Sequence, residues 1–235
     1  IRRQRQMCIR DSGFAIPYLA RRFSKFMPAT FACALYRIFR PNKTVSKEKR
    51  KNNHKYNLLC HRYFMRSLGW GIITAATIYL ASLVLPENET PWIAFFIIML
   101  YTLMEIDKRM LLLPDILTVP LLIAGFSYAV FAGGMLGYEP AASAANSALG
   151  AAAGYVIPVI ASLFLIKKYP EAFGGGDIKL LSAVGSWVGL TNIPYVILLS
   201  CLLFAVSCFI NKQRQGAFGP SIVIASLIIL FLSEY

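Results

Sequence analysis

The chain has 235 residues, of which 57% are hydrophobic and 15% charged, and its mean hydropathy is +0.57. This composition excludes an ordinary soluble domain, because several apolar stretches approach the ~20 residues with which a helix crosses a bilayer. The stretches do not alternate between apolar and polar residues, which excludes a membrane β-barrel. The sequence therefore predicts an all-α, polytopic integral membrane bundle of about six or seven transmembrane helices.

The net charge of +13 is concentrated near the beginning of the chain. Residues 1–66 contain 17 of the 24 Lys and Arg residues and only two acids, Asp11 and Glu48. Such a segment either binds nucleic acid or anionic lipid, or is a cytoplasmic segment that obeys the positive-inside rule. We expect the second, with the lipid bilayer and no nucleic acid as a partner. The five cysteines form no CxxC pair, so we expect no metal and no other cofactor.

The first twelve residues, IRRQRQMCIRDS, resemble the translation of a transposon-end adapter used in DNA library preparation. We interpret residues 1–12 as a translated adapter that does not belong to the fold. Residues 13–66 are then a basic cytoplasmic segment, in which 43–56 is a solvated run of charges. We expect residues 67–235 to form the transmembrane domain.

The apolar stretches of this domain follow one another with short polar separations. Their ranges are 68–85, 91–106, 116–135, 146–166, 178–189, 193–210 and 220–233. Pro91 suits the first turn of the second helix. The stretch 178–189 is short for a full crossing, so its status as a span is open. The pairs Gly150/Gly154 and Gly185/Gly189 have the spacing that allows close helix contact in lipid.

The positive-inside rule orients these spans. With the basic segment in the cytoplasm, the chain returns to that side at Lys108/Arg109 and at Lys167/Lys168. It returns a third time at Lys212/Arg214 if 178–189 is a crossing. The loops on the other side carry only acids.

Four acids lie at the cytoplasmic edge of the predicted spans, namely Glu105, Asp107, Asp115 and Asp177. Two carboxyl groups about 3 Å apart cannot both ionise, so they share a proton, and such a pair can activate water as base and acid. The glycines before Asp177 would adopt positive φ and approach a substrate strand.

Each acid also has a structural interpretation. Asp177 could cap a helix after the glycine turn, and Asp115 after Pro114 is expected to be the N-cap of the third span. Asp107 could be a rim carboxylate paired with Lys108 or Arg109, and Glu105 is expected to be a rim residue.

Three blocks nevertheless resemble the type IV prepilin peptidases, a family of membrane aspartic peptidases. They are EIDKRMLLLPDILTVPLL (105–122), FGGGDIKLLSAVGSWVG (173–189) and GAFGP (216–220), in the family's order. The resemblance covers roughly residues 62–235. It implies that Asp107 and Asp177 are the catalytic pair, with Gly174 and Gly176 as the glycine framework and Lys179, Pro114 and Asp115 as supporting motif residues.

The resemblance also implies a location and a substrate. Members of this family cut the basic leader, after a glycine, from type IV prepilins or type II secretion pseudopilins, at the cytoplasmic face of the bacterial inner membrane. Many members also methylate the new N-terminus, using S-adenosylmethionine, and carry a zinc-binding segment with two CxxC pairs. The sequence has neither these pairs nor any other support for methyltransferase activity.

Two other functions remain alternatives. A related peptidase that cuts inside the bilayer would have deeper aspartates than Lys108, Arg109 and Lys179 indicate. A membrane transporter or assembly subunit with cation- or proton-binding carboxylates would show internal repeats and helices broken near the midplane.

Overall fold

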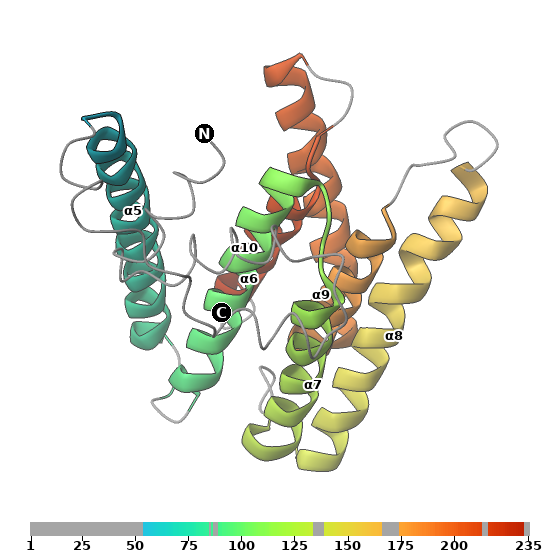
Figure 1. The fold of residues 1–235 in the computed structure, drawn as a ribbon. Helices are drawn as coiled ribbons and strands as arrows, with labels where there is room; N and C mark the ends of the chain where they lie inside the picture. Colours follow the sequence, from blue (N-terminus) through green and yellow to red (C-terminus); the bar gives the residue numbers. More distant parts are fainter. Residues whose placement is uncertain are drawn as a thin grey trace. The chain divides into compact units, whose positions relative to one another are not determined.

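The computed structural model describes residues 54–84, 86, 89–133, 139–165, 174–212 and 216–232, and all its regular elements are helices. The helices are α5 (His54–Val84), α6 (Thr90–Met110), α7 (Asp115–Ala132), α8 (Pro140–Leu165), α9 (Gly175–Asn211) and α10 (Gly219–Leu232) (Figure 1). The prediction of an all-α helical membrane bundle is confirmed. The predicted adapter, residues 1–12, and most of the basic segment, residues 13–53, lie outside the described residues.

The chain divides into two compact units, Ile1–Thr77 and Ile78–Tyr235. In the first unit, α5 begins at His54, well before the predicted start of the apolar stretch. Residues 54–67 precede the apolar stretch and contain neither proline nor glycine. The sequence of this part therefore contains no residue that would interrupt a helix. Within α5 the hydroxyl of Thr74 donates to the carbonyl of Trp70 at 2.7 Å, which satisfies this polar side chain inside an apolar helix.

In the second unit, two short connections determine where α6 ends and α7 begins. Pro91 lies in the first turn of α6, as predicted, and α6 continues to Met110. The helix is closed by Leu111, whose φ of 53° is left-handed and whose N–H donates to the carbonyl of Asp107. Pro114 occupies the N-cap position of α7, so the expectation that Asp115 is the N-cap is wrong. A proline has no N–H to leave unpaired at this end of a helix.

The longest element, α9, is two helical arms rather than one rod. Gly189 has φ 77° and ψ 177°, which interrupts the helix between a first arm, residues 175–188, and a second arm, residues 190–211. A straight helix of this length would extend about 55 Å. Yet Lys179 of the first arm contacts Asp115, and Phe204 of the second arm packs against Phe218 just before α10. The two arms therefore fold back on each other at Gly189, as Figure 1 shows.

Small residues hold the first arm against α8. A Cβ at Gly150 would lie 2.3 Å from the carbonyl oxygen of Gly185, and one at Gly185 would lie 2.2 Å from that of Gly150. The hydroxyl of Ser147 donates to the carbonyl of Ser186 at 2.7 Å. The predicted close contact through Gly150 and Gly185 is confirmed, with the two backbones in contact where no side chain intervenes.

Gly189 takes part in the predicted close contact, since a Cβ at Gly150 would lie 2.8 Å from its Cα, and it also interrupts the helix. Its positive φ suits glycine, because an L side chain is strained there. The break leaves the N–H of Leu190 without a helical partner, and the side-chain oxygen of Asn146 accepts it at 2.9 Å. One polar side chain of α8 thus satisfies the interrupted helix in an apolar environment.

Aromatic rings connect the first arm to α6 and α7. Trp187 stacks on Phe96 with ring centroids 4.7 Å apart and on Tyr128 with centroids 5.4 Å apart. The indole N–H of Trp187 donates to the carbonyl of Leu121 at 2.9 Å. All three rings are buried, so they form the centre of the core.

Four helices of the described residues are long and apolar enough to cross a membrane. They are Thr90–Met110, Asp115–Ala132, Ala141–Phe164 and Gly175–Asn211, and shorter apolar helices cover Leu68–Val84 and Gly219–Leu232. Large apolar side chains such as Phe164 and Phe209 are exposed on the outside, as expected where lipid is the solvent. The chain is a multi-pass membrane protein. The first arm of α9 measures only about 21 Å, so its full crossing stays a prediction.

Candidate active site

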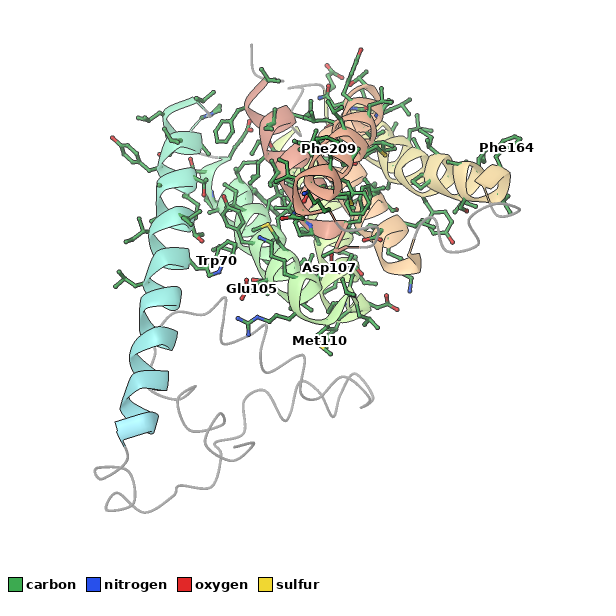
Figure 2. The ribbon with its side chains drawn as sticks, turned by 90° about the horizontal axis from the view of Figure 1, so that it is seen from above. Trp70, Glu105, Asp107, Met110, Phe164 and Phe209 are labelled. Atoms are coloured by element: carbon green, nitrogen blue, oxygen red, sulfur yellow. The ribbon has the colours of Figure 1, made fainter. Side chains whose placement is uncertain are left out.

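Asp107 lies in the last turn of α6 and is buried, with 4% of its surface exposed. The backbone N–H of Gly219, the first residue of α10, donates to its Oδ2 at 2.8 Å. Figure 2 shows Asp107 on the side of α6 toward α10. The carboxylate therefore faces the N-terminus of a helix, where free N–H groups favour negative charge.

Gly219 is required at this contact because the carboxylate leaves no room for a side chain. A Cβ at Gly219 would lie 2.7 Å from Oδ2 of Asp107 and 3.1 Å from its Cγ. The sequence analysis identified GAFGP as a block that resembles the family but missed Gly219 as a partner of Asp107. The Gly-Pro pair at the start of the helix could have indicated this contact. A glycine at a helix N-terminus leaves its backbone N–H accessible to a carboxylate.

Asp177 lies in the first turn of α9, near the end of α6 that carries Asp107. Gly174 holds the N-cap position, so Asp177 is not the N-cap residue. Its carboxyl group turns back to the backbone of Gly174, and a Cβ there would lie 3.0 Å from Oδ2 of Asp177. The absence of a side chain at Gly174 therefore leaves space for the Asp177 carboxylate.

Gly176 allows the start of α9 to lie close to the connection between α6 and α7. A Cβ at Gly176 would lie 2.9 Å from the Cβ of Leu113 and 3.4 Å from its backbone nitrogen. Leu113 belongs to the short connection between α6 and α7, so this contact fixes the start of α9 against it. The expectation of positive φ is wrong for Gly174, whose φ is −66°, and Gly175 and Gly176 are regular helical residues.

The structure brings the two predicted aspartates together from separate helices. The carboxyl groups of Asp107 and Asp177 are within range of electrostatic interaction with each other. Each is held by the backbone of a glycine, Gly219 for Asp107 and Gly174 for Asp177. Two buried or half-buried carboxyl groups within this range influence each other's ionisation.

Lys179 and Asp115 form an exposed ion pair beside this site. The Nζ of Lys179 lies 2.7 Å from Oδ1 and 2.8 Å from Oδ2 of Asp115. The pair joins the first turn of α7, directly after Pro114, to the first arm of α9. Because the expected cap role of Asp115 is wrong, this contact with Lys179 is the role that the structure gives its side chain.

Glu105 differs from the expected rim residue, because it is fully buried. It pairs with Arg109 one turn further along α6, and Nε of Arg109 donates to Oε1 of Glu105 at 2.8 Å. This pairing occupies Arg109, so Arg109 is not the rim partner considered for Asp107. Two carboxylates two residues apart on α6 thus have separate partners.

Comparison with known proteins agrees with the motifs. The type IV leader peptidase family matches residues 94–209, a range that contains Asp107 and Asp177. A prepilin leader peptidase/N-methyltransferase of Vibrio cholerae is 30% identical over 181 residues, which cover 72% of this chain and 65% of the relative. No solved structure gives a significant match.

Two further relatives carry the same name. The protein of Aeromonas salmonicida is 34% identical over 149 residues, covering 59% of this chain and 47% of the relative. The protein of Xanthomonas campestris is 42% identical over 135 residues, covering 54% of this chain and 44% of the relative. The chain thus spans about half to two thirds of the length of these curated relatives.

Proposed function

Because the chain carries a domain of the type IV leader peptidase family over residues 94–209, we propose that it is a membrane aspartic endopeptidase. Its substrates are type IV prepilins or type II secretion pseudopilins, from which it removes the basic leader. The observation that carries the proposal is that Asp107 and Asp177, from two different helices, lie within electrostatic range of each other.

The chemistry follows from two carboxyl groups that share one proton. One carboxylate removes a proton from water, which attacks the carbonyl carbon of the scissile peptide bond. The other carboxyl group protonates the leaving amine, and the peptide bond breaks. The N–H of Gly219 orients Asp107, and the first turn of α9 orients Asp177, so neither carboxylate must be reorganised during the reaction.

The location of the site supports cleavage at a membrane surface. Lys108 follows Asp107, Lys179 is two residues after Asp177, and Lys212 closes the second arm, whose end lies near the same site. Under the positive-inside rule this end faces the cytoplasm. We propose the bacterial inner membrane as the location, with the leader cut on its cytoplasmic side.

Leader cleavage tests the proposal directly. The chain is co-expressed with a prepilin in a host that lacks such a peptidase, and substrate mass is compared for the parent protein, Asp107→Asn and Asp177→Asn. Asp115→Asn is the matched control, because Asp115 is exposed and paired with Lys179 rather than near the buried carboxylate. We expect both dyad variants to lose cleavage at unchanged membrane levels and the control to retain most of it.

Two other outcomes carry information. Cleavage that survives Asp107→Asn but not Asp115→Asn would assign the first catalytic role to Asp115. Absence of cleavage by the parent protein, at normal membrane levels and with several prepilins, would contradict the peptidase and favour a carboxylate-containing transporter or assembly subunit.

Gly219→Ala tests the backbone contact with Asp107. A Cβ at this position must displace the carboxylate, because it would lie 2.7 Å from Oδ2. We expect leader cleavage to fall by about a hundredfold, since an error of about 1 Å in catalytic position has effects of this size. Retained cleavage would show that Asp107 tolerates a different orientation.

A further inference from the structure

The connection between α6 and α7 carries apolar side chains on its outside. It consists of residues 111–114, and Met110, labelled in Figure 2, is the last helical residue before it. Leu111 is 68% exposed and Leu112 is 48% exposed, whereas Leu113 is buried. Among these three leucines, the described part of the fold packs mainly around the third.

Leu111 also has a backbone conformation that disfavours its side chain. Its φ of 53° and ψ of 38° are left-handed, a conformation in which helices are usually closed by glycine. A leucine there costs free energy. Packing against the described residues does not offset this cost, because most of the side chain is exposed. An apolar neighbour outside the chain would offset it.

The position of the connection identifies lipid as that neighbour. The helices on either side, α6 and α7, are both long and apolar enough to cross a membrane. A connection of four residues spans at most about 14 Å when it is fully extended. Leu111 and Leu112 therefore stay close to the ends of two membrane-spanning helices, where the surface of the bilayer lies.

Charged residues on both sides limit how deep these leucines lie. Lys108 precedes them and is exposed, and Asp115 follows them in an exposed ion pair with Lys179. These charges stay with water and headgroups, because burying them in hydrocarbon is costly. An apolar tip between exposed charges suits the boundary between the headgroups and the acyl chains.

A stable protein interface needs more apolar surface than this connection offers. Such interfaces bury about 800 Å² on each partner. Two leucine side chains between charged residues form a much smaller patch. Lipid has no such requirement, because each side chain gains from its own contact with acyl chains.

We propose that Leu111 and Leu112 insert at the boundary between the headgroups and the acyl chains and anchor the α6–α7 connection to the membrane. The partner of this surface is the lipid itself. The proposal does not depend on the proposed peptidase activity, because it concerns the contact of the connection with the bilayer.

The contacts of the connection carry this anchoring to the candidate site. The backbone N–H of Leu111 donates to the carbonyl of Asp107 at 2.8 Å. Leu113 lies against Gly176, which directly precedes Asp177. The anchor therefore fixes the depth in the membrane of the two helix ends that hold the aspartates.

Two labelling experiments on the full chain in liposomes test the contact. The first uses a phosphatidylcholine whose acyl chain carries a diazirine near the headgroup, and mass spectrometry maps the residues labelled after irradiation. The second oxidises the protein in the same liposomes with hydroxyl radicals from the water phase. We expect lipid label on Leu111 and Leu112 at several times the level of buried Leu113, and little oxidation of either.

Two double variants separate the side chains from the backbone. Leu111→Asn with Leu112→Asn removes the apolar surface, and asparagine tolerates the left-handed conformation. We expect hydrogen exchange of the amides of residues 111–113 in liposomes to accelerate by about tenfold. Leu111→Met with Leu112→Met is the matched control, because it keeps the apolar surface, and its exchange should equal that of the parent protein. Unfolding in detergent verifies that both variants are folded.

Oxidation of Leu111 and Leu112 from the water phase without lipid label would overturn the anchor. Equal exchange in the asparagine variant and the parent protein would overturn it as well. Protection from oxidation that appears only after a prepilin is added would assign these leucines to the substrate instead of lipid. None of these outcomes decides the proposed function, which leader cleavage tests separately.

Discussion

The two arms of α9 have similarly apolar sequences but different surroundings. In the first arm, residues 180–188 are all buried, whereas Tyr195, Leu198 and Phe209 of the second arm are each more than half exposed. The first arm has small residues, such as Gly185, where α8 approaches its backbone. The second arm presents large side chains outward to lipid. The difference teaches that in a membrane the distribution of small residues, rather than hydrophobicity, decides which helix is enclosed.

The largest effect is expected where the first arm contacts α8. Gly185→Leu forces a side chain into the carbonyl of Gly150, so the helices must separate, and we expect the free energy of unfolding to fall by about 3 kcal/mol. The measurement is unfolding of the purified protein in detergent. Gly69→Leu in α5 is the control, since a Cβ there meets no described atom within 4 Å. Equal effects of the two substitutions would show that close packing does not distinguish the first arm.

A smaller effect is expected at the break between the arms. Gly189→Ala puts a side chain at φ 77° and against the amide of Asn146, so we expect a loss of about 2 kcal/mol. The same unfolding measurement applies. If Asn146 causes part of this cost, Gly189→Ala combined with Asn146→Ala is less destabilising than the sum of the single changes. Additive effects would contradict the contact.

Asn146→Ala alone is expected to have a moderate effect. It removes the acceptor of the Leu190 N–H, and an unpaired backbone group in an apolar environment costs about 1 kcal/mol or more. Asn146→Asp keeps an acceptor at this position and serves as the comparison in the unfolding assay. Faster amide exchange of Leu190 in Asn146→Ala would locate the effect at the break. Unchanged exchange would show that another group accepts this N–H.

The smallest effect is expected on the lipid-facing side of the second arm. Leu198 is 69% exposed, so Leu198→Ala should change the free energy of unfolding by less than about 0.5 kcal/mol. Leader cleavage should also remain near its original rate. A loss as large as that of Gly185→Leu would mean that this face is covered by another protein rather than by lipid.

Local sequence signals predicted where the helices lie, but they predicted less well at which residues the helices begin and end. The apolar stretches predicted α6 to α8 and α10, and the separation between 178–189 and 193–210 predicted two segments where Gly189 now divides α9. The prediction was wrong about the N-cap of α7, because capping preference favours aspartate while proline can hold the same position without losing a hydrogen bond.

The sequence by itself determined the membrane class, the order of the spans and the candidate pair Asp107 and Asp177, because hydropathy and short motifs are local properties. Only the tertiary structure decided that Gly219 holds Asp107, that Lys179 binds Asp115 and that Glu105 is buried with Arg109. The contacts of Gly219 and Lys179 join residues 112 and 64 positions apart, respectively. Their geometry depends on how closely the segments approach, and the close approach is possible because Gly219 and Gly176 have no side chain.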